Sequence, residues 1–575
     1  MPFIEKLKDW ASSRGGDCAL VAGEQRYSFA QLLQAAQTVH KDPATNPAMN
    51  LIPDTVHGLV PGTSVSADSS TAGQLVVVDA ASGADLVVQF CGAVFHSLTA
   101  MVLENGWPLA LRQDLKGAAE AWLEERNNDV SPPFLLGLSS GTSGLPKAFV
   151  RNADSWETSF ANSTEYFGLG TETVTLAPGP LAASMNLYAL GESIYAGSTF
   201  VILPSFNADA ALLAIARNKV NRVVLVPTIL DLLAARGLAT KQSGDGISSI
   251  LCAGSVLSAS TVALAHQWAP NAKIQQYYGA AELGFVAAST LKFAPTNSIL
   301  ARPQDLNLPS APELQGNSSL VDVTKGAVVR KAGQNRKVGE DAPAGVGTAF
   351  PRVEISIRDE VGNLLPAGQS GYIFVKSPYV CCGYAWGDDG LAFGTLRADK
   401  HRVSPAPLFS ASLFSAPLGS GDDGQWCTVR DQGHLDSQGV LHVAGRASDM
   451  IIVAGTNVYP HHVEEVLAMA DNCAGVLTIV VTGIADPVRG QRVVAGIYSS
   501  ASLLDGDHSA TGSTTAGAVS FMAALRHVAS TLTAQQRPTR YFEMLELPLT
   551  NSGKISRAIL SQWINEGDTR AQRIT

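Results

Sequence analysis

Short apolar runs alternate with longer segments of helical pattern through the first 250 residues of the chain. The apolar runs are rich in Val, Ile and Leu and lie at 75–80, 199–204 and 220–227. Segments rich in Ala and Leu stand beside them, as at 211–219 and 229–237. Continuous apolar strands next to helices are typical of parallel sheets that helices cover on both faces. The pattern therefore predicts an α/β fold.

The pattern changes after residue 286. Pro, Asn, Ser and Gly become frequent over 286–345, which predicts a long and partly irregular excursion. From 346 to 445, short alternating strands separated by turn residues predict a small antiparallel or barrel-like unit. Within it, the Gly/Ser/Pro-rich segment 387–425 predicts a surface loop, with a docking patch as the alternative.

The segment after Asp449 shows the order strand, turn, helix, strands, helix, which predicts a small α+β domain. Pro460 stands at a suitable first position of a helix. Val463, Val466 and Leu467 follow at helical spacing and are expected to form its apolar face.

Composition and charge narrow the class of protein. The chain has 575 residues, of which 46% are hydrophobic and 16% are charged, so it can build large cores. Its length suggests about three or four compact units. The formal net charge of −10 disfavours a nucleic acid or an anionic membrane surface as partner.

Two further features bear on membranes and on compartment. Polar residues such as Gln89 and His96 interrupt the apolar stretch 86–103, which favours a buried helix over a membrane span. The N-terminus lacks the layout of a signal peptide. Seven cysteines contain no CxxC pair and fit neither a zinc site nor a disulfide framework. We expect reduced thiols in a cytoplasmic protein with no integral membrane segment; the oligomeric state stays open.

A glycine-rich loop, SSGTSGLPK at 139–147, follows the apolar run 134–138. Glycines let backbone N–H groups converge on an anion, and the hydroxyl groups and Lys147 add donors and charge. The loop is not a Walker A motif, because Pro146 precedes the lysine and Ala148 follows it. A flexible linker is the alternative, but linkers seldom end in Leu-Pro-Lys directly after a buried strand. The segment predicts a phosphate-binding loop.

This loop resembles the phosphate-loop signature of the adenylate-forming enzymes, which include acyl-CoA synthetases, carrier-loading adenylation domains and luciferases. Four further segments resemble that family's motifs, in the family's order. YYGAAE resembles Tyr-Gly-x-Thr-Glu, WCTVRD resembles Thr-Gly-Asp, GRASD resembles the hinge signature, and PLTNSGKISR matches Pro-x-Thr-x-x-Gly-Lys-x-x-Arg. They lie at 277–282, 426–431, 445–449 and 548–557.

The resemblance implies an architecture. A large N-terminal AMP-binding adenylation domain, residues 1–445, would consist of two parallel-sheet α/β subdomains and a small β-barrel-like subdomain. A hinge at 446–450 would join it to a mobile C-terminal α+β domain, residues 451–575, which carries the catalytic lysine.

The resemblance also assigns roles to single residues. Lys554 would be the catalytic lysine that bridges the substrate carboxylate and the α-phosphate. Glu282 would act in catalysis and, with Thr142, hold Mg²⁺. Asp449 would be the hinge residue. The residues implied in ATP and AMP binding are Ser139, Ser140, Gly141, Thr142, Ser143, Gly144, Lys147, Tyr278, Gly279, Asp431 and Arg446. Those implied in the acyl and pantetheine channel are Ala183, Met185, Ala253, Gly254 and Gly455.

Three of these residues have a stated contact. Tyr278 would stack near the adenine. Asp431 would accept hydrogen bonds from both ribose hydroxyl groups. Arg446 would contact the ribose or a phosphate.

The implied reaction has two steps at one site. A carboxylate attacks the α-phosphorus of ATP to give acyl-AMP and pyrophosphate, and the thiol of CoA then attacks the acyl group and releases AMP. The small domain is expected to swing about Asp449 between the steps. Small and apolar residues around the acyl site, such as Met185 and Phe285, favour a fatty or other hydrophobic or aryl acid over an amino acid.

Four positions depart from the family's pattern. Ala153 and Ala183 stand where the family often has histidine, Ala281 where it has a hydroxyl residue, and Arg430 where it has glycine. The leading prediction is an acyl-CoA ligase that uses ATP, Mg²⁺ and CoA. The alternatives are a stand-alone acyl-AMP ligase that loads a carrier-protein thiol, and a degenerate nucleotide-binding protein; luciferase-type oxygenation is more distant.

Overall fold

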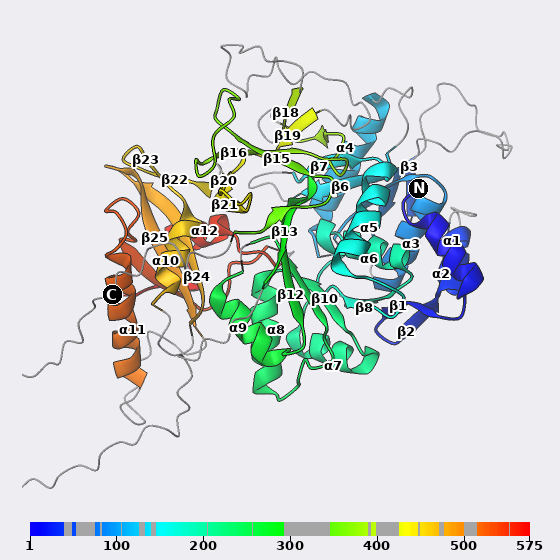
Figure 1. The fold of residues 1–575 in the computed structure, drawn as a ribbon, viewed down its shortest axis with the longest axis horizontal. Helices are drawn as coiled ribbons and strands as arrows, with labels where there is room; N and C mark the ends of the chain where they lie inside the picture. Colours follow the sequence, from blue (N-terminus) through cyan, green and yellow to red (C-terminus); the bar gives the residue numbers. More distant parts are fainter. Residues whose placement is uncertain are drawn as a thin grey trace, which may run out of the picture. The chain divides into compact units, whose positions relative to one another are not determined.

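The computed structural model (Figure 1) describes residues 1–39, 49–52, 75–80, 83–104, 106–125, 133–139, 145–203, 205–255, 257–291, 345–388, 393–397, 425–446, 449–470, 476–499, 514–550 and 553–574. All of them belong to one compact unit. Their strands form four sheets.

The largest sheet has nine strands in the order β14-β13-β12-β11-β10-β8-β9-β1-β2. They are β1 (Cys18–Ala22), β2 (Gln25–Ser28), β8 (Val174–Leu176), β9 (Thr199–Ile202), β10 (Arg222–Leu225), β11 (Ser249–Ala253), β12 (Lys273–Ala280), β13 (Gly284–Thr290) and β14 (Thr348–Ala349). Pairing is parallel from β12 to β1, as the apolar pattern predicted, and antiparallel at both edges. The edges differ because a short turn such as 281–283 can join only antiparallel strands.

A second sheet has the order β17-β7-β6-β5-β4-β3. Its strands are β3 (Met49–Ile52), β4 (Leu75–Val78), β5 (Thr99–Val102), β6 (Leu135–Ser139), β7 (Lys147–Arg151) and β17 (Tyr384–Trp386). β4, β5 and β6 run parallel. β17 comes from far along the chain and pairs antiparallel with β7, so it carries its residues to the strand that follows the glycine-rich loop.

Nine helices of the described N-terminal residues accompany these sheets. They are α1 (Ile4–Ser13), α2 (Phe29–Thr38), α3 (Gly83–Phe95), α4 (Leu109–Glu125), α5 (Ala153–Phe167), α6 (Ser184–Ala196), α7 (Ala208–Asn218), α8 (Pro227–Ala239) and α9 (Ala259–Trp268). Side chains cap several N-termini; Asn152 accepts from the backbone N–H of Ser155 at the start of α5.

The apolar stretch 86–103 is not one buried helix. It forms most of α3 and then β5, because the chain turns after Phe95 and Ser97 takes a left-handed φ of 60°. Periodicity cannot separate a buried helix from a buried strand in so apolar a run. Within the described residues, no helix is long and apolar enough to cross a membrane.

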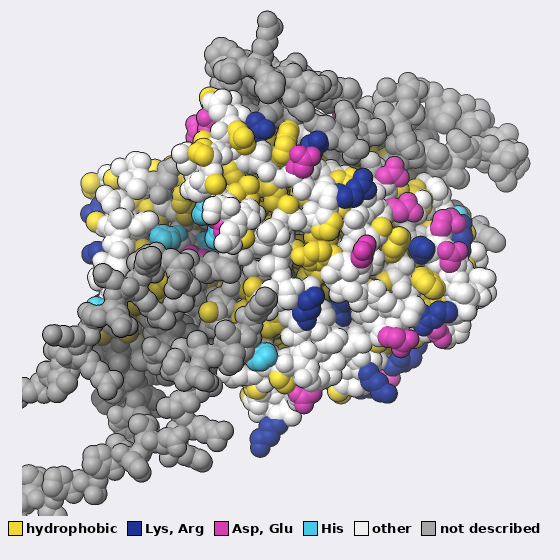
Figure 2. All heavy atoms as spheres, in the orientation of Figure 1, with side chains coloured by type: hydrophobic (Ala, Val, Ile, Leu, Met, Phe, Trp, Pro, Cys, Tyr) yellow, Lys and Arg dark blue, Asp and Glu magenta, His cyan; other side chains and the backbone are white. Residues whose placement is uncertain are grey.

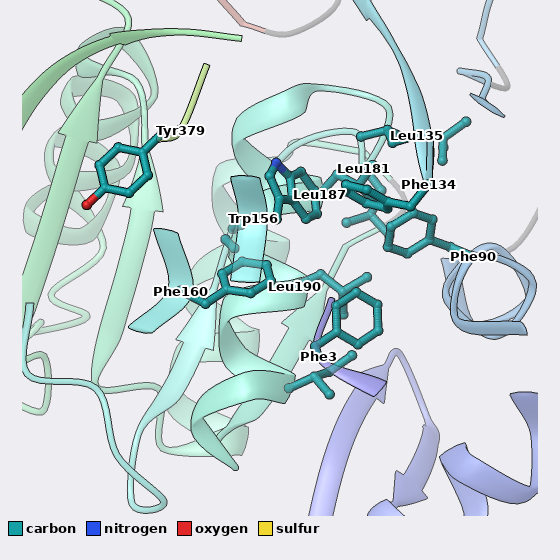
Figure 3. Close-up of a cluster of buried hydrophobic side chains, with 14 of the residues drawn as sticks. Phe3, Phe90, Phe134, Leu135, Trp156, Phe160, Leu181, Leu187, Leu190 and Tyr379 are labelled. Atoms are coloured by element: carbon teal, nitrogen blue, oxygen red, sulfur yellow. The ribbon is translucent and has the colours of Figure 1, made fainter. Parts of the chain in front are cut away.

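The main hydrophobic core lies where α1, α3, α5 and α6 meet the sheets. Figure 3 shows Phe3, Phe90, Phe134, Trp156 and Phe160 pointing toward one another, and each is at most 4% exposed. Burial of this aromatic surface fixes α3 and α5 relative to the start of β6. On the face seen in Figure 2, Lys and Arg side chains alternate with Asp and Glu over the described residues.

The predicted small antiparallel unit is confirmed as a sheet in the order β18-β19-β16-β20-β21, with β15 beside β16. Its strands are β15 (Glu354–Arg358), β16 (Gly371–Lys376), β18 (Gly394–Arg397), β19 (Gln425–Thr428), β20 (Asp431–Leu435) and β21 (Leu441–Arg446). β18 lies inside the segment 387–425 that was predicted to be a loop; 389–392 and 398–424 lie outside the described residues. Of the predicted excursion 286–345, the first residues belong to β13, and 292–344 lie outside the described residues.

The C-terminal part has the predicted α+β character. It contains β22 (Ile451–Val453), β23 (Thr456–Val458), α10 (Pro460–Ala468), β24 (Val476–Asp486), β25 (Gly490–Ser499), α11 (Thr514–Ala529), β26 (Arg540–Met544), α12 (Arg557–Glu566) and β27 (Ala571–Ile574). Pro460 is the first residue of α10, and Val463 and Leu467 are fully buried in a core of their own. The boundaries 1–445, 446–450 and 451–575, and the mobility of the last part, stay predictions.

One ion pair is buried between α6 and β10. Arg222 Nη2 donates to Glu192 Oε2 at 2.9 Å, and both side chains are only 2% exposed. Arg222 Nη1 also donates to Thr175 Oγ1 at 3.4 Å. A charge taken out of water needs its partner, because an uncompensated one in the interior is strongly unfavourable.

We expect Arg222→Met to lower the free energy of unfolding by about 3–5 kcal/mol, because Glu192 would be left buried without its cation. The double variant Arg222→Met/Glu192→Met should recover most of this loss, since both charges are then gone. Urea-induced unfolding of the three proteins measures it. A single variant as stable as the wild type would contradict the role given to the pair.

Candidate functional site

A cavity of about 820 Å³ lies at the carboxyl ends of β6, β10, β11 and β12. Open α/β sheets place their ligands at this end of the strands. Residues from all five motifs line the cavity: Ser139, Lys147, Gly279, Glu282, Arg430, Arg446 and Lys554. Four of the residues predicted for the acyl and pantetheine channel, Ala183, Met185, Ala253 and Gly254, line it too. The fold therefore brings together residues that lie more than 400 positions apart in the sequence.

The glycine-rich loop connects two paired strands at the cavity. Ser139 ends β6, Lys147 begins β7, and the two residues are partners in the sheet register. The indole N–H of Trp386 donates to the carbonyl of Pro146 at 2.9 Å and fixes the end of the loop. Ser140, Gly141, Thr142, Ser143 and Gly144, which were predicted to bind ATP, lie outside the described residues.

Tyr278 and Asp431 meet between two sheets. The phenol of Tyr278 on β12 donates to Asp431 Oδ2 at 2.7 Å, and Arg446 Nε on β21 lies 3.6 Å from Oδ1. Burial raises the pKa of Asp431, while Arg446 and Tyr278 oppose the shift. Asp431 Oδ1 has no hydrogen-bond partner among the described residues, so it retains capacity to accept a bond from a ligand.

Arg430 takes a left-handed backbone conformation, with φ of 65°. Its N–H donates to Thr428 Oγ1 at 3.0 Å, which holds the turn between β19 and β20. A residue with a Cβ adopts this conformation less easily than glycine does. The turn before Asp431 thus keeps a shape that suits the glycine of the family motif, despite the arginine.

Glu282 lies in the turn between β12 and β13 and is only 8% exposed. The phenol of Tyr384 donates to Glu282 Oε1 at 2.5 Å. Burial, followed by the charge of Glu282, raises the pKa of Tyr384 far above its ordinary value, so Tyr384 remains a donor. Lys147 Nζ lies 5.9 Å from the centre of the Tyr384 ring. Tyr384 therefore connects the lysine of the glycine-rich loop to Glu282.

Arg151 fixes the backbone of the same turn. It is 3% exposed, and its guanidinium donates to the carbonyl oxygens of Tyr379 and Ala281, each at 2.6 Å. The backbone N–H of Cys381 donates to the carbonyl of Glu282 at 2.7 Å. Ala281 supplies no hydroxyl group, but these contacts hold its main chain. Sequence reasoning missed Arg151 and Tyr384, since their role depends on the pairing of β17 with β7.

Lys554 lies against Gly254, which has a φ of 94°. A Cβ at this glycine would stand 3.0 Å from Lys554 Cε, and the backbone conformation favours glycine. The carbonyl of Lys554 accepts from the N–H of Thr550 at 2.8 Å, which closes the turn that presents the lysine. Desolvation by the surrounding protein, followed by the charge of Arg446, lowers the pKa of Lys554. The charges of Glu282 and Asp431 oppose this shift.

The predicted hinge residue Asp449 lies off the cavity wall, beside the last residue of the lysine motif. Arg557 Nη1 is 3.6 Å from Asp449 Oδ2, and Arg557 Nη2 donates to both carboxylate oxygens of Glu464 at 2.7 and 2.9 Å. Tyr459 also donates to Gln432, the neighbour of Asp431. Arg557 thus connects the predicted hinge segment, α10 and the loop of Lys554.

The predicted channel residue Gly455 and the departing position Ala153 also lie off the wall. Gly455, with φ of 81°, forms with Ala454 the tight turn between β22 and β23. Ala153 is the first residue of α5 and packs against the main core. Tyr278 and Asp431 are likewise not among the lining residues, although Arg430 and Arg446 beside them are.

Glu282 suits magnesium. Among the described residues, no group of three or more His, Cys, Asp or Glu side chains gathers around one point. Mg²⁺ in nucleotide sites is held by one or two carboxylates together with phosphate oxygens and water. A single buried carboxylate that faces the cavity fits this donor set.

Comparison with known proteins supports the same class. The profile of the AMP-binding enzyme family matches residues 68–385, more than half of the chain. An uncharacterized acyl-CoA ligase, YhfT of Bacillus subtilis, is 28% identical over 439 residues, which cover 76% of this chain and 70% of the relative. A putative long chain fatty acid-CoA ligase, VraA of Staphylococcus haemolyticus, is 25% identical over 452 residues. This alignment covers 78% of this chain and 74% of the relative.

The fold is also that of a solved structure. o-Succinylbenzoate CoA synthetase (MenE) of Bacillus subtilis, in complex with ATP and a magnesium ion, superposes with a TM-score of 0.62 at 18% identity, over 97% of this chain and 98% of that one. On the match of the family profile, the chain belongs to the AMP-binding enzyme family and is an AMP-forming acid–thiol ligase of the acyl-CoA ligase branch.

Proposed function

We propose that this protein activates a hydrophobic or aryl carboxylic acid as its acyl-AMP and transfers the acyl group to the thiol of CoA. The observation that carries the proposal is the composition of one cavity: Lys147, Glu282 and Lys554 line the same space as the apolar residues Met185 and Phe285. Cations and a carboxylate suit the triphosphate and its metal, and the apolar wall suits the acid.

The first step joins the acid to the nucleotide. A carboxylate oxygen attacks the α-phosphorus of ATP, the bond to the β-phosphate oxygen breaks, and pyrophosphate leaves. Negative charge builds on the α-phosphoryl oxygens as this happens. Lys554, held beside Gly254, would stabilise that charge, and Lys147 would face the leaving pyrophosphate.

In the second step the thiol sulfur of CoA attacks the acyl carbon and the bond to the AMP oxygen breaks, so that AMP leaves and the thiol proton is lost. We propose that the C-terminal part, residues 451–575, turns about Asp449 between the steps. The contacts of Arg557 with Asp449 and Glu464 support this, because they couple the hinge to the loop of Lys554.

We assign the nucleoside to the pair of Tyr278 and Asp431, with Asp431 Oδ1 accepting from the ribose and Arg446 adding a fixed cation. Glu282 would hold Mg²⁺, with Thr142 as the second ligand that the family motif suggests. When bound, the metal neutralises charge on the phosphate oxygens. Tyr384 would orient Glu282 for that role.

A location in the cytoplasm is part of this proposal. The thiols that the structure describes are free, which suits a reducing compartment: Cys18, Cys91, Cys252, Cys381, Cys382 and Cys427.

The thiol acceptor needs a direct comparison, because a carrier-protein thiol would use the same chemistry as CoA. Free CoA should be acylated faster than a phosphopantetheinylated carrier.

A panel of fatty, aryl and amino acids tests the reaction class. With ATP and Mg²⁺, we expect acid-dependent release of pyrophosphate and, with hydroxylamine as trap, the hydroxamate of a hydrophobic or aryl acid. Lys554→Ala should slow this step about 10²–10³-fold, because a group that stabilises developing charge is removed. Lys8→Ala, an exposed lysine on α1, should match the wild type. If no acid releases pyrophosphate, the proposal fails.

The rate of the adenylation step should fall at alkaline pH. Lys554 acts as a cation and its pKa is lowered, so its charge is present at low pH and is lost as pH rises through a value below the ordinary 10.5. We expect the adenylation rate to fall on that limb. In Lys554→Arg the residual rate should keep its plateau to higher pH, because a guanidinium stays protonated. An identical limb in both proteins would count against Lys554 as the titrating group.

We expect Tyr384→Phe to raise the Mg²⁺ concentration needed for half-maximal adenylation by about fivefold, since one hydrogen bond to Glu282 is lost while the ring beside Lys147 remains. The partly exposed Tyr166 provides the control Tyr166→Phe, which should leave the magnesium dependence as it is. Titration of the pyrophosphate release rate with Mg²⁺ measures both. Equal magnesium dependence in wild type and Tyr384→Phe would remove Tyr384 from the metal site.

A further inference from the structure

Three hydroxyl groups stand on the apolar wall of the cavity. Ser155 and Ser159 are four residues apart on α5 and therefore lie on one face of the helix. Tyr188 on α6 stands opposite Ser159, and all three residues line the cavity. Ser155 and Ser159 are each 2% exposed. Buried hydroxyl groups need hydrogen-bond partners, either within the protein or from a ligand.

The hydrogen bonds of these groups differ. Ser155 Oγ donates to the carbonyl of Asn152 at 2.9 Å and accepts from Arg151 at 3.2 Å, so its capacity is largely used within the protein. Tyr188 Oη lies 2.7 Å from Ser159 Oγ and 3.0 Å from Ser163 Oγ. Ser163 is fully buried, and its hydroxyl also reaches the carbonyl of Phe160 at 3.5 Å.

Ser159 retains hydrogen-bonding capacity toward the cavity. A serine hydroxyl has one proton and two lone pairs. Whichever partner donates in the pair with Tyr188, Ser159 keeps at least one lone pair for a further donor. If Tyr188 donates, Ser159 also keeps its own proton. A hydroxyl group, which both donates and accepts, fits either arrangement.

Aromatic rings fix the position of this pair. The ring of Tyr188 makes edge contacts with Trp156 and Phe285, each at 5.3 Å between ring centres. Phe285 in turn lies 4.5 Å from Tyr277. All four rings line the cavity, and aromatic surfaces of this kind favour a flat ring between them.

The pair is also displaced from the catalytic lysine along the acyl wall. Lys554 lies against Gly254, and the preceding Ala253 is the sheet partner of Tyr277. From Tyr277 the ring contacts lead through Phe285 to Tyr188. An acid whose carboxylate is at Lys554 would thus present its far end to Ser159.

We propose that Ser159 and Tyr188 form a subsite for a hydroxyl substituent, so that the substrate is an aryl carboxylic acid with a hydroxyl group on its ring. This rests on the proposed acid activation and adds the substrate class. An ammonium substituent at this position would need a carboxylate beside it. The described residues of this wall offer hydroxyl groups instead, since the lining includes Ser155, Ser159 and Tyr188 but not Glu157 of α5.

Matched acids test the subsite: benzoic acid, 3-phenylpropanoic acid and the meta- and para-hydroxy forms of each. The measured quantity is the ratio of kcat/KM for a hydroxylated acid to that for its parent, from pyrophosphate release. For the wild type, we expect a ratio of about ten or more for at least one hydroxylated acid and its parent. Ser159→Ala should bring it close to one. The substitution suits a helix, because alanine has the highest helix propensity.

Ser163→Ala is the matched control, because Ser163 touches Tyr188 from the core side and does not line the cavity. It should keep the wild-type ratio. The subsite is overturned if the wild type prefers the parent acids, if Ser159→Ala keeps the preference, or if Ser163→Ala loses it equally. Turnover of the parent acids in those cases would leave acid activation standing, whereas no turnover of any acid would overturn both proposals.

Discussion

The arrangement of the site depends on two buried carboxylates, Glu282 in the wall of the cavity and Asp431 beside it. Each accepts a hydrogen bond from a tyrosine, Tyr278 or Tyr384, at 2.7 and 2.5 Å. Carboxylates taken out of water require partners and favour nearby cations. The charge of Asp431 accordingly raises the pKa of Arg446. The two carboxylates also oppose the loss of charge on Lys554. Because these groups come from three sheets and the C-terminal part, the electrostatics of the site depend on the whole assembly of elements.

This arrangement explains how an acidic chain can bind an anionic nucleotide. The net charge is −10, and on the visible face both signs of charge alternate (Figure 2). The cations that matter are local: Lys147, Arg446 and Lys554 all line the cavity. Cations that line the site act on a bound ligand more strongly than the distant surface charges, which salt screens.

Much of the fold and of the site could be predicted from the sequence, because both rest on local signals. Apolar runs located the parallel strands, and the helix that begins at Pro460 was recognised from its first residue. The motifs supplied Glu282, Lys147 and Lys554, which the fold gathers at one cavity.

The rest depends on contacts between distant segments. Tyr384 reaches Glu282 only because β17 pairs with β7, and Arg151 acts through main-chain carbonyls that no pattern marks. The left-handed backbone of Arg430 and the ion pair of Arg222 with Glu192 also follow from tertiary packing. The apolar run 86–103 misled for the same reason: burial alone does not distinguish α3 from β5.

The most direct test of the account follows the oxygen atoms of the acid. When an acid that the enzyme accepts carries ¹⁸O in both carboxylate positions, attack on the α-phosphorus places one of these atoms between carbon and phosphorus. Cleavage by the thiol then leaves it on the nucleotide. We expect mass spectrometry to find one ¹⁸O atom in the AMP formed with CoA and ATP. AMP without the label, or ADP as the nucleotide product, would contradict an acyl-AMP intermediate.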